Sequence, residues 1–311
     1  MAKILNYGSL NIDYVYGVDH FVRPGETLAS NSRHIFAGGK GLNQSVALAR
    51  AGGTVYHAGA VGSDDSKVLL HEIIENGIHE DFLKRRDMPS GHTIIQVDKN
   101  GQNCILLYGG ANQSLTTEEI DATLSHFEKG DYLILQNEVN NIEYLINKGH
   151  ECGLKVCFNV SPFTRELLKL PLEKCAFLIV NEIEGSAMVD MDPSTDPYVL
   201  IDALSQKFPH SSFVLTLGSR GSLLKETGRS VISCKSFKVQ AVDTTAAGDT
   251  FLGFLIASLS RGVDGAIALK TATAASAIAV TRKGASPSIP ALAEVEQFLK
   301  ESDTEVLVDR L

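Results

Sequence analysis

Hydrophobic positions along the chain fall into two alternating patterns. Short, almost continuous apolar runs of strand length are separated by longer stretches in which apolar residues recur with the period of a helix. The apolar runs cover residues 4–7, 55–60, 132–135, 156–160, 177–180 and 213–217. The helical stretches cover residues 43–51, 66–75, 117–128, 198–208, 248–260, 265–280 and 291–300. This alternation predicts an α/β fold in which helices cover a mostly parallel sheet.

Two segments depart from the alternation and predict a small β-sheet outside the main one. Residues 11–36 have strand-prone flanks around a Pro-Gly turn at 24–25. Residues 91–109 contain two strand-prone runs around an Asn-Gly pair at 100–101, which is a strong hairpin signal. We expect these segments to form a lid over one edge of the main sheet. No repeat, low-complexity tract or linker occurs, so residues 1–311 are expected to form a single domain.

Composition and charge narrow the range of partners. With 311 residues, of which 44% are hydrophobic, the chain can bury a large core. Its net charge of −9, without a concentrated run of basic residues, argues against a nucleic-acid or anionic-membrane partner and favours a small molecule. No apolar run is long enough to span a membrane, and the first residues lead into a strand without a signal-peptide core. We therefore expect a cytoplasmic protein.

Several common chemical signatures are missing. The sequence contains no P-loop, no G-x-G-x-x-G dinucleotide motif, no H-E-x-x-H zinc motif and no G-x-S-x-G nucleophile elbow. Its five cysteines are odd in number, and the closest pair, Cys152 and Cys157, has no neighbouring histidine cluster. We expect reduced thiols rather than disulfides or a zinc site.

The segment from Asp243 to Asp249 is the first candidate for chemistry. Ala246, Ala247 and Gly248 stand where a predicted helix begins, and their minimal side chains would let backbone N–H groups approach an anion at the helix N-terminus. Asp249 lies at the rim of this cradle and is suited to accept a proton during phosphoryl transfer. The alternative is structural: Gly248 forms a tight turn and Asp249 merely caps the helix.

The segment Gly38-Gly39-Lys40-Gly41-Leu42-Asn43 is the second candidate. Three glycines around one lysine suggest close backbone approach by a polar ligand. Lys40 and Asn43 would present donors suited to sugar hydroxyls. The alternative is an ordinary glycine-rich turn between a strand and a helix.

Together these two segments, about 200 residues apart, resemble the signature pair of the ribokinase family of ATP-dependent sugar kinases. Further pieces occur in the order typical of that family, at residues 8–13, 23–27, 109–112, 181–184, 216–221 and 280–288. The resemblance implies a ribokinase-like three-layer α/β/α sandwich with a small β-sheet lid. It also implies a homodimer that forms through that lid.

Within the family, the forms of these motifs point toward members that convert ATP and D-ribose to ADP and ribose 5-phosphate. By resemblance, Asp249 would take the proton of the 5-hydroxyl, and the amides of Ala246, Ala247 and Gly248 would bind the transferring phosphoryl group. The implied sugar-binding residues are Asn11, Asp13, Gly39, Lys40, Asn43 and Glu138. Independently, Asn11, Asp13 and Glu138 each follow a predicted strand, where ligands of open α/β sheets bind.

The resemblance further implies ATP, Mg²⁺ and K⁺ sites. Asn181 and Glu184 would organise Mg²⁺ around the phosphates. The nucleotide would be bound by Thr216, Gly218, Ser219, Gly221 and Thr273. The monovalent cation would be bound, mostly through carbonyls, by Asp243, Thr245, Ala279, Arg282, Gly284 and Ser288. From the residues alone, Asn181 and Glu184 could equally be a solvated helix-start pair, and residues 279–288 a plain loop.

Departures from the family pattern keep other functions open. Lys67 stands where relatives usually have glycine, and His92, Ile94 and Gln96 share one face of the predicted lid, where a polar residue could change the accepted sugar. The alternatives are a kinase for deoxyribose, another pentose or a nucleoside, and a non-catalytic sugar- or nucleotide-binding regulatory protein. The last should have lost the base or the cradle, whereas Asp249 and Gly248 are both present.

Overall fold

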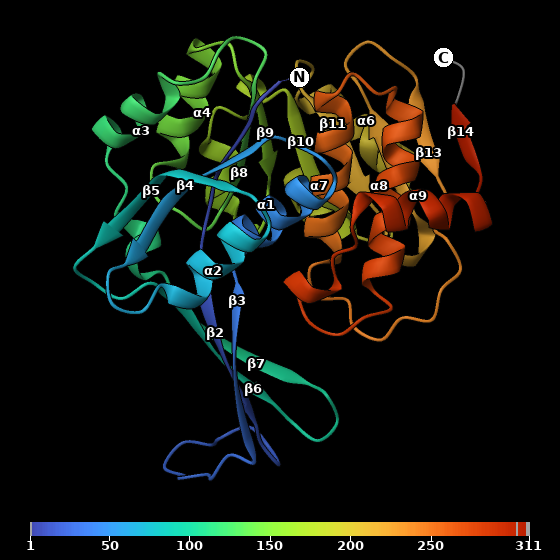
Figure 1. Cartoon of the computed structure of the whole chain (residues 1–311). Helices are drawn as coiled ribbons and strands as arrows, with labels where there is room; N and C mark the ends of the chain where they lie inside the picture. The colour runs from blue at the N-terminus through green and yellow to red at the C-terminus, as the bar shows by residue number, and fades with distance from the viewer. Residues whose placement is uncertain (1, 303, 309–311) are drawn as a thin grey trace.

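A computed structural model describes residues 2–302 and 304–308, which form two separate β-sheets and flanking helices (Figure 1). The ten strands of the large sheet are β1 (Ile4–Tyr7), β4 (Val55–Gly62), β5 (His79–Arg86), β8 (Tyr132–Gln136), β9 (Lys155–Asn159), β10 (Phe177–Asn181), β11 (Ser212–Thr216), β12 (Ser222–Lys225), β13 (Val231–Cys234) and β14 (Val306–Val308). Their order is β14-β13-β12-β11-β10-β9-β8-β1-β4-β5. The strands from β11 to β5 run parallel, and β12, β13 and β14 extend the sheet antiparallel.

The predicted parallel sheet is confirmed. All six predicted strands are present, and their side chains are almost entirely buried on both faces, as the continuous apolar runs indicated. Strand β5 was not predicted because it is a half-exposed and mostly charged edge strand, His-Glu-Asp-Phe-Leu-Lys-Arg-Arg. The antiparallel extension was also missed, because its strands have only three or four residues each.

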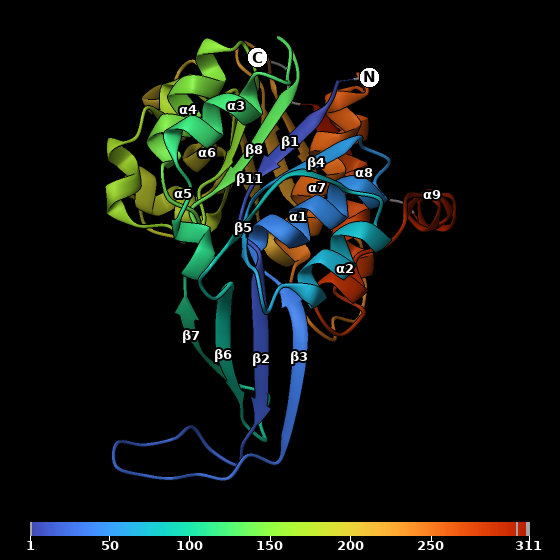
Figure 2. The same ribbon diagram turned by 60° about the vertical axis from the view of Figure 1, so that its left-hand side comes forward.

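Helices cover both faces of the large sheet and complete three layers (Figure 2). One face carries α1 (Lys40–Arg50), α2 (Lys67–Glu75), α7 (Ala247–Ser260), α8 (Gly265–Ala279) and α9 (Leu292–Glu301). The other carries α3 (Thr117–Leu124), α4 (Ile142–Glu151), α5 (Glu182–Met188) and α6 (Pro197–Lys207). Each face has its own hydrophobic cluster. The predicted α/β/α sandwich is confirmed, although α4 and α5 were not among the expected helices.

The small sheet projects from the body of the molecule (Figures 1 and 2). Its strands are β2 (Asn11–Gly17), β3 (Ser32–Gly38), β6 (Gly91–Val97) and β7 (Asn103–Tyr108), in the order β3-β2-β6-β7. The predicted Asn-Gly turn joins β6 and β7, with the Gly101 N–H donating to the Asp98 carbonyl at 2.9 Å. The predicted Pro-Gly turn instead lies within a long connection, residues 18–31, between β2 and β3.

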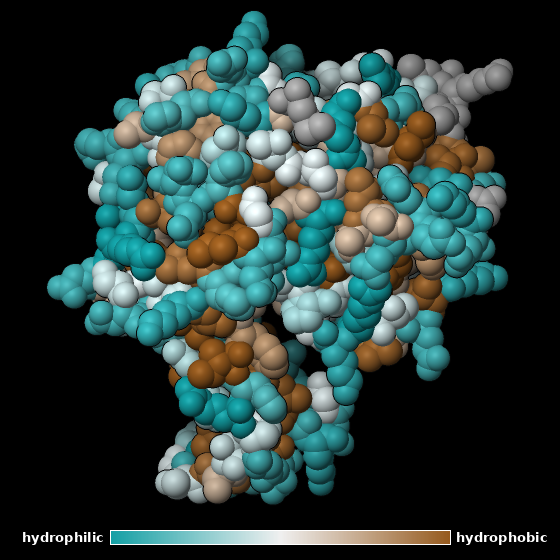
Figure 3. Space-filling model, in the orientation of Figure 1, coloured by the Kyte–Doolittle hydropathy of each residue, from teal (hydrophilic) through white to brown (hydrophobic). Residues whose placement is uncertain are grey.

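Hydrophobic side chains of the small sheet remain exposed, and brown residues are visible on it in Figure 3. On the edge strand β7 the exposed fractions are 54% for Ile105, 67% for Leu106 and 49% for Leu107. The small sheet therefore combines an unpaired strand edge with a solvent-exposed apolar surface.

Two further expectations concern the thiols and membrane insertion. None of the five cysteines is in a disulfide, and Cys157, Cys175 and Cys234 are buried. Among residues 2–302 and 304–308, no helix is both long and apolar enough to cross a lipid bilayer.

Candidate active site

Glycines allow the start of α1 to pack closely against the β1–β2 connection. A Cβ atom at Gly41 would lie 2.3 Å from the Ser9 nitrogen, and one at Gly38 would lie 2.1 Å from Oδ2 of Asp13. Gly39 has a φ of 92°, a conformation that other residues rarely adopt. The sequence suggested that a ligand approaches these glycines, but in the structure they make room for the chain itself.

This packing brings the predicted sugar-binding residues together. Oε2 of Glu138, which follows β8, accepts hydrogen bonds from the Ser9 hydroxyl and from the Lys40 backbone N–H at 3.0 Å. Asn11, at the start of β2, is only 3% exposed, and Asn112 donates to its Oδ1 at 2.8 Å. These contacts join the carboxyl ends of β1 and β8 to the first turn of α1.

Asp13 faces this cluster from the small sheet. Thr93 on β6 donates to Oδ1 of Asp13 at 2.5 Å. Burial raises the pKa of Asp13, and the charge of Glu138 raises it further, whereas the hydrogen bond from Thr93 acts in the opposite direction.

The residues predicted to tune the sugar lie on the wrong face of the small sheet. His92, Ile94 and Gln96 do share a face, but strand register pairs Thr93 with Asp13, so the three residues point away from Asp13. The His92 ring packs instead against Tyr14 and Tyr108, with centroids 6.0 and 5.0 Å away. That part of the specificity prediction is wrong, because alternation along a single strand does not indicate which face meets the site.

The predicted anion cradle opens α7. Ala246 adopts the left-handed conformation, with φ 57°, and Ala247 begins the helix. A Cβ at Gly248 would meet no atom within 4 Å, so the space in front of this residue is open. The Ala247 N–H already donates to the Thr244 carbonyl at 3.2 Å, which leaves it less available than the sequence suggested.

Asp249 is buried in the first turn of α7, with 7% of its surface exposed. Its Oδ1 accepts from Gln44 Nε2 at 2.9 Å, and its Oδ2 accepts from Asn43 Nδ2 at 3.3 Å. The Oδ1 of Asn43 is itself buried without a hydrogen-bond partner. A buried acceptor of this kind is suited to a ligand hydroxyl.

Lys40 connects the two halves of the site electrostatically. Burial by itself lowers the pKa of the Lys40 ammonium, but three neighbouring carboxylates raise it more, so the net pKa lies above the usual value. These carboxylates belong to Asp249, Glu138 and Glu184. Lys40 therefore remains charged and partly balances the negative charge that surrounds it.

The predicted nucleotide-binding residues line one cavity of about 770 Å³ beside the start of α7. Thr216, Gly218, Ser219, Gly221, Thr273, Ala247 and Gly248 all contribute to its wall. Gly221 has a φ of 105°, and a Cβ there would lie 2.0 Å from the Cys234 carbonyl oxygen, so only glycine fits. Three basic residues, Arg220, Lys235 and Lys238, also line this cavity, where Arg220 pairs with Glu182 and Lys235 with Glu305.

Asn181 and Glu184 form a capping box at the start of α5. The Glu184 N–H donates to Asn181 Oδ1 at 2.9 Å, and the Asn181 N–H donates to Glu184 Oε2 at 3.0 Å. Neither residue lines the large cavity. The capping box therefore uses the side-chain oxygen of Asn181 and one of the two carboxylate oxygens of Glu184. The other oxygen, Glu184 Oε1, lies outside the capping box.

Three of the predicted cation-loop residues are tied together by hydrogen bonds. Oδ1 of Asp243 accepts from the Thr245 N–H at 2.9 Å and from its hydroxyl at 2.7 Å, while Oδ2 accepts from the Gly284 N–H at 2.9 Å. Burial raises the pKa of Asp243, but these hydrogen bonds outweigh it and the net pKa is lowered. Hydrogen bonds within the protein therefore already hold residues 243–245 next to Gly284.

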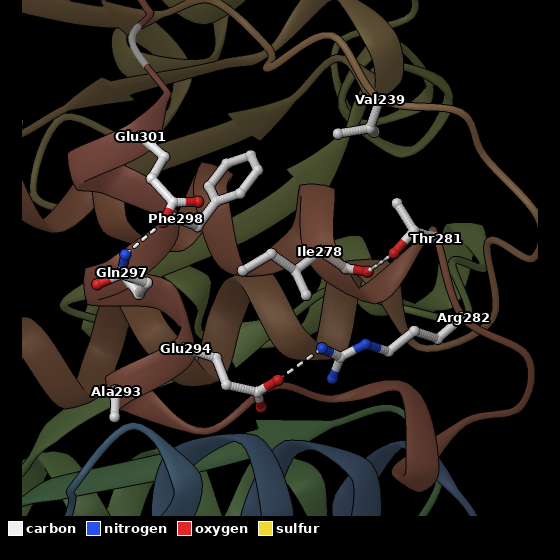
Figure 4. Close-up of a pocket in the computed structure, with 9 residues that line it drawn as sticks. All are labelled: Val239, Ile278, Thr281, Arg282, Ala293, Glu294, Gln297, Phe298 and Glu301. Atoms are coloured by element: carbon white, nitrogen blue, oxygen red, sulfur yellow. Dashed lines mark hydrogen bonds and ion pairs between the residues drawn. The ribbon is translucent and has the colours of Figure 1, made fainter.

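The other three cation-loop residues contribute differently. The Arg282 side chain turns toward Glu294 of α9, with a 2.6 Å ion pair, and so leaves only backbone atoms to the loop (Figure 4). The Ala279 carbonyl accepts from the Arg282 N–H at 3.0 Å, and the Ser288 hydroxyl donates to the Ala285 carbonyl at 2.7 Å. Within residues 2–302 and 304–308, no group of three or more His, Cys, Asp or Glu side chains is arranged to hold a metal ion.

Several polar residues of the site were missed. Ser9 and Asn112 lie inside segments that carry the family resemblance, and Gln44 directly follows Asn43, so proximity to the motifs was the available signal. Thr93 had no such signal, because its role depends on register between strands that are 80 residues apart.

Comparison with known proteins identifies the family. The model of the pfkB family of carbohydrate kinases matches residues 1–292, and the chain belongs to this family. The ribokinase of Haemophilus influenzae is 34% identical over 310 residues, which cover 96% of this chain and 99% of that protein. The deoxyribokinase of Salmonella typhi is 31% identical over 300 residues, which cover 94% and 97%. The structure of Arabidopsis thaliana ribokinase complexed with ribose and ATP superposes with a TM-score of 0.84 at 27% identity, covering 96% and 99%.

Proposed function

We propose that this protein transfers the γ-phosphoryl group of ATP to the 5-hydroxyl of D-ribose, giving ribose 5-phosphate and ADP. The observation that carries the proposal is the position of Asp249. Its buried carboxylate stands at the start of α7, between the polar cluster of Glu138 and Lys40 and the cavity lined by Gly248. The relatives named ribokinase, from Haemophilus influenzae and Arabidopsis thaliana, match nearly the whole chain and supply the acceptor.

The reaction follows from this placement. Asn11, Asp13, Gly39, Lys40, Asn43 and Glu138 hold the sugar hydroxyls. Asp249 accepts the proton of the 5-hydroxyl as its oxygen forms a bond to the γ-phosphorus. The bond from that phosphorus to the β,γ-bridging oxygen breaks, and ADP leaves with the electron pair. The start of α7, at Ala246, Ala247 and Gly248, stabilises the charge on the transferring group.

ATP occupies the cavity lined by Thr216, Gly218, Ser219, Gly221 and Thr273 in this proposal. Glu184, with Asn181, offers the oxygen donors that Mg²⁺ prefers, and Mg²⁺ neutralises phosphate charge when bound. The carboxylate of Asp243 and the oxygens of Thr245, Ala279, Arg282, Gly284 and Ser288 suit K⁺. We therefore propose that the protein uses both Mg²⁺ and K⁺.

The small sheet acts as a lid over the sugar and, through its exposed apolar strand β7, as the interface of a homodimer. This assignment makes the whole chain one kinase domain with a lid at residues 11–36 and 91–109. We also propose that the protein is located in the cytoplasm.

The test is ADP formation from Mg-ATP with D-ribose, 2-deoxyribose, fructose, adenosine or uridine, each with and without K⁺. We expect strong dependence on ribose and stimulation by K⁺. Asp249→Asn should lower kcat by about 10³-fold or more with ribose binding nearly intact, because the amide keeps the shape but cannot accept the proton. If the protein prefers deoxyribose or a nucleoside, that compound replaces ribose as the proposed acceptor. Absence of turnover with every acceptor would reject the kinase and favour a regulatory protein.

A further inference from the structure

A single glutamine fixes one oxygen of the proposed base. Gln44 on α1 is fully buried, and its Nε2 donates both to Oδ1 of Asp249 at 2.9 Å and to Oδ1 of Asn159 at 3.1 Å. Asn159 is oriented in turn by its Nδ2, which donates to the Ile179 carbonyl at 3.2 Å. A carboxylate and a carbonyl can only accept, so Gln44 has one satisfactory amide orientation, with Nε2 toward Asp249.

The other end of Gln44 is held by a buried chain of uncharged side chains. Gln136 on β8 donates through Nε2 to Gln44 Oε1 at 2.7 Å and to Asn6 Oδ1 at 2.9 Å. Asn6 on β1 donates through Nδ2 to the Ser45 hydroxyl at 2.8 Å and to the Gly41 carbonyl at 2.7 Å. All of these side chains are inaccessible to solvent.

The chain ends at His57 on β4, and its direction is determined throughout. Nε2 of His57 lies 3.2 Å from the Gly8 carbonyl, which can only accept, so this nitrogen carries the proton. Nδ1 then accepts from the Ser45 hydroxyl, 2.7 Å away. Burial lowers the pKa of His57 to about 4, which is consistent with this neutral form.

We propose that Gln44 is a positioning residue for phosphoryl transfer: it holds Oδ1 of Asp249 so that Oδ2 receives the proton of the acceptor hydroxyl. The orientation of Gln44 is in turn fixed by the hydrogen-bonded chain through Gln136, Asn6, Ser45 and His57. Oδ2 is the less constrained oxygen, since its one hydrogen bond, from Asn43, is 3.3 Å long. The inference rests on the proposed function, because it takes Asp249 as the base.

The charged surroundings of Asp249 define what the removal of Gln44 should change. Lys40 on α1 is the cation close to Asp249, and Glu138 and Glu184 are the further carboxylates around that ammonium. The residues that face Asp249 from α1 besides Lys40, namely Asn43 and Gln44, are uncharged. The Gln44 N–H holds Oδ1 of Asp249, so its loss frees this carboxylate to rotate while the three charges stay in place.

The experiment compares Gln44→Leu and the nearly isosteric Gln44→Glu with the wild-type protein. Both variants should lower kcat by about 10- to 100-fold, with KM for the sugar changed less than about threefold. The loss of turnover should be larger for Gln44→Glu than for Gln44→Leu, because a second carboxylate then faces Asp249. Ser211→Ala, which removes a buried hydrogen bond to the Leu172 carbonyl elsewhere, is the matched control and should move neither value.

A second readout does not depend on the acceptor. Proteins labelled with ¹³C at the aspartate carboxyl, with the Asp249 signal assigned through Asp249→Asn, give the chemical shift of this carboxyl directly by NMR. A changed chemical shift in both Gln44 variants, but not in Ser211→Ala, supports the proposal even if the sugar proves not to be ribose. An unchanged kcat, or a lower kcat with an unchanged carboxyl chemical shift, would overturn it. Lack of wild-type turnover, by contrast, would reject the proposed function.

Discussion

The Thr93 hydroxyl lies 2.5 Å from Oδ1 of Asp13 and joins the two central strands of the small sheet, β6 and β2, next to the polar cluster at the base of that sheet. The other oxygen of Asp13, Oδ2, lies against Gly38 of β3. In the proposed function this carboxylate binds the sugar, so the geometry of the small sheet would affect sugar binding.

Thr93→Val should weaken sugar binding with little effect on turnover. The variant loses a hydrogen bond that lowers the pKa of Asp13, so this already raised pKa rises further and the carboxylate is protonated at a higher pH. We expect KM for ribose to increase about 5- to 10-fold at pH 7 and to rise more steeply than in the wild type as the pH falls. Steady-state kinetics between pH 8 and 5 test this. An equal loss in kcat with constant KM would contradict it.

Two glycines of α7 should respond oppositely to alanine. A Cβ at Gly248 meets no atom of the protein, whereas one at Gly253 would lie 2.3 Å from Cβ of Ala47 on α1. Gly248→Ala should therefore keep the wild-type Tm but lower kcat about 10-fold or more, since its methyl group enters the proposed phosphoryl site. Gly253→Ala should lower the free energy of unfolding by about 1–3 kcal/mol. Thermal unfolding and kinetics on both variants decide whether the open space at Gly248 is functional.

Asp243→Asn should reduce stimulation by K⁺. The amide lacks the negative charge and can no longer accept on both sides from Thr245 and Gly284. We expect the ratio of activity with K⁺ to activity without it to fall several-fold. Asp192→Asn is a matched control, because Asp192 makes a similar turn, accepting from the Ser194 N–H at 2.8 Å and its hydroxyl at 2.6 Å, far from this loop. An unchanged ratio in Asp243→Asn would remove this residue from the cation site.

His57 should make the protein less stable in mild acid. Its pKa is lowered to about 4 in the folded protein from 6.5, so the unfolded chain binds the extra proton between these values. Stability contributed by the neutral ring is present above pH 6.5 and is lost as the pH falls toward 4, by about 2 kcal/mol at pH 5. Urea unfolding at pH 7 and pH 5 should show this loss in the wild type but not in His57→Gln. His71→Gln, at a histidine with a 67% exposed side chain, should behave like the wild type.

The exposed apolar strand β7 should mediate assembly. Leu106→Glu places a charge on a residue that is 67% exposed, and it should convert a dimer to a monomer at micromolar concentration without changing Tm. Ile74→Glu, on α2 and 62% exposed, is the control that should remain dimeric. Light scattering of the three proteins gives the answer, and a monomeric wild type would contradict the predicted dimer.

The hydrophobic pattern was sufficient for the elements whose burial is uniform. The strands β1, β8 and β10 are buried on both faces, so their apolar runs alone locate them. The charged edge strand β5 carries no such signal, and its position depends on the neighbouring strand β4 rather than on its own composition. Helix α4 follows Asn141, which has φ 60° and makes no side-chain cap, although Ile142, Leu145 and Ile146 recur with the helical period.

The candidate site was predicted as a set of residues but not as a set of contacts. Family resemblance indicated Asn43 and Asp249, yet the hydrogen bond between Gln44 and Asp249 joins residues 205 positions apart. The sequence also could not reveal that the glycines around Lys40 accommodate Asp13 and Ser9. Such partners depend on how α1 packs between the large sheet and α7, which only the folded chain defines.

The polar cluster and the large cavity come from different parts of the chain. Residues up to Glu138 form the cluster, residues from Thr216 onward line the cavity, and the first turn of α7 is where the two meet. Under the proposed function, acceptor preference can therefore diverge during evolution through substitutions in the first half of the chain, while the second half retains the same phosphoryl donor. For protein engineering, the corresponding chimaera would exchange the segment before β9 between relatives and keep the rest unchanged.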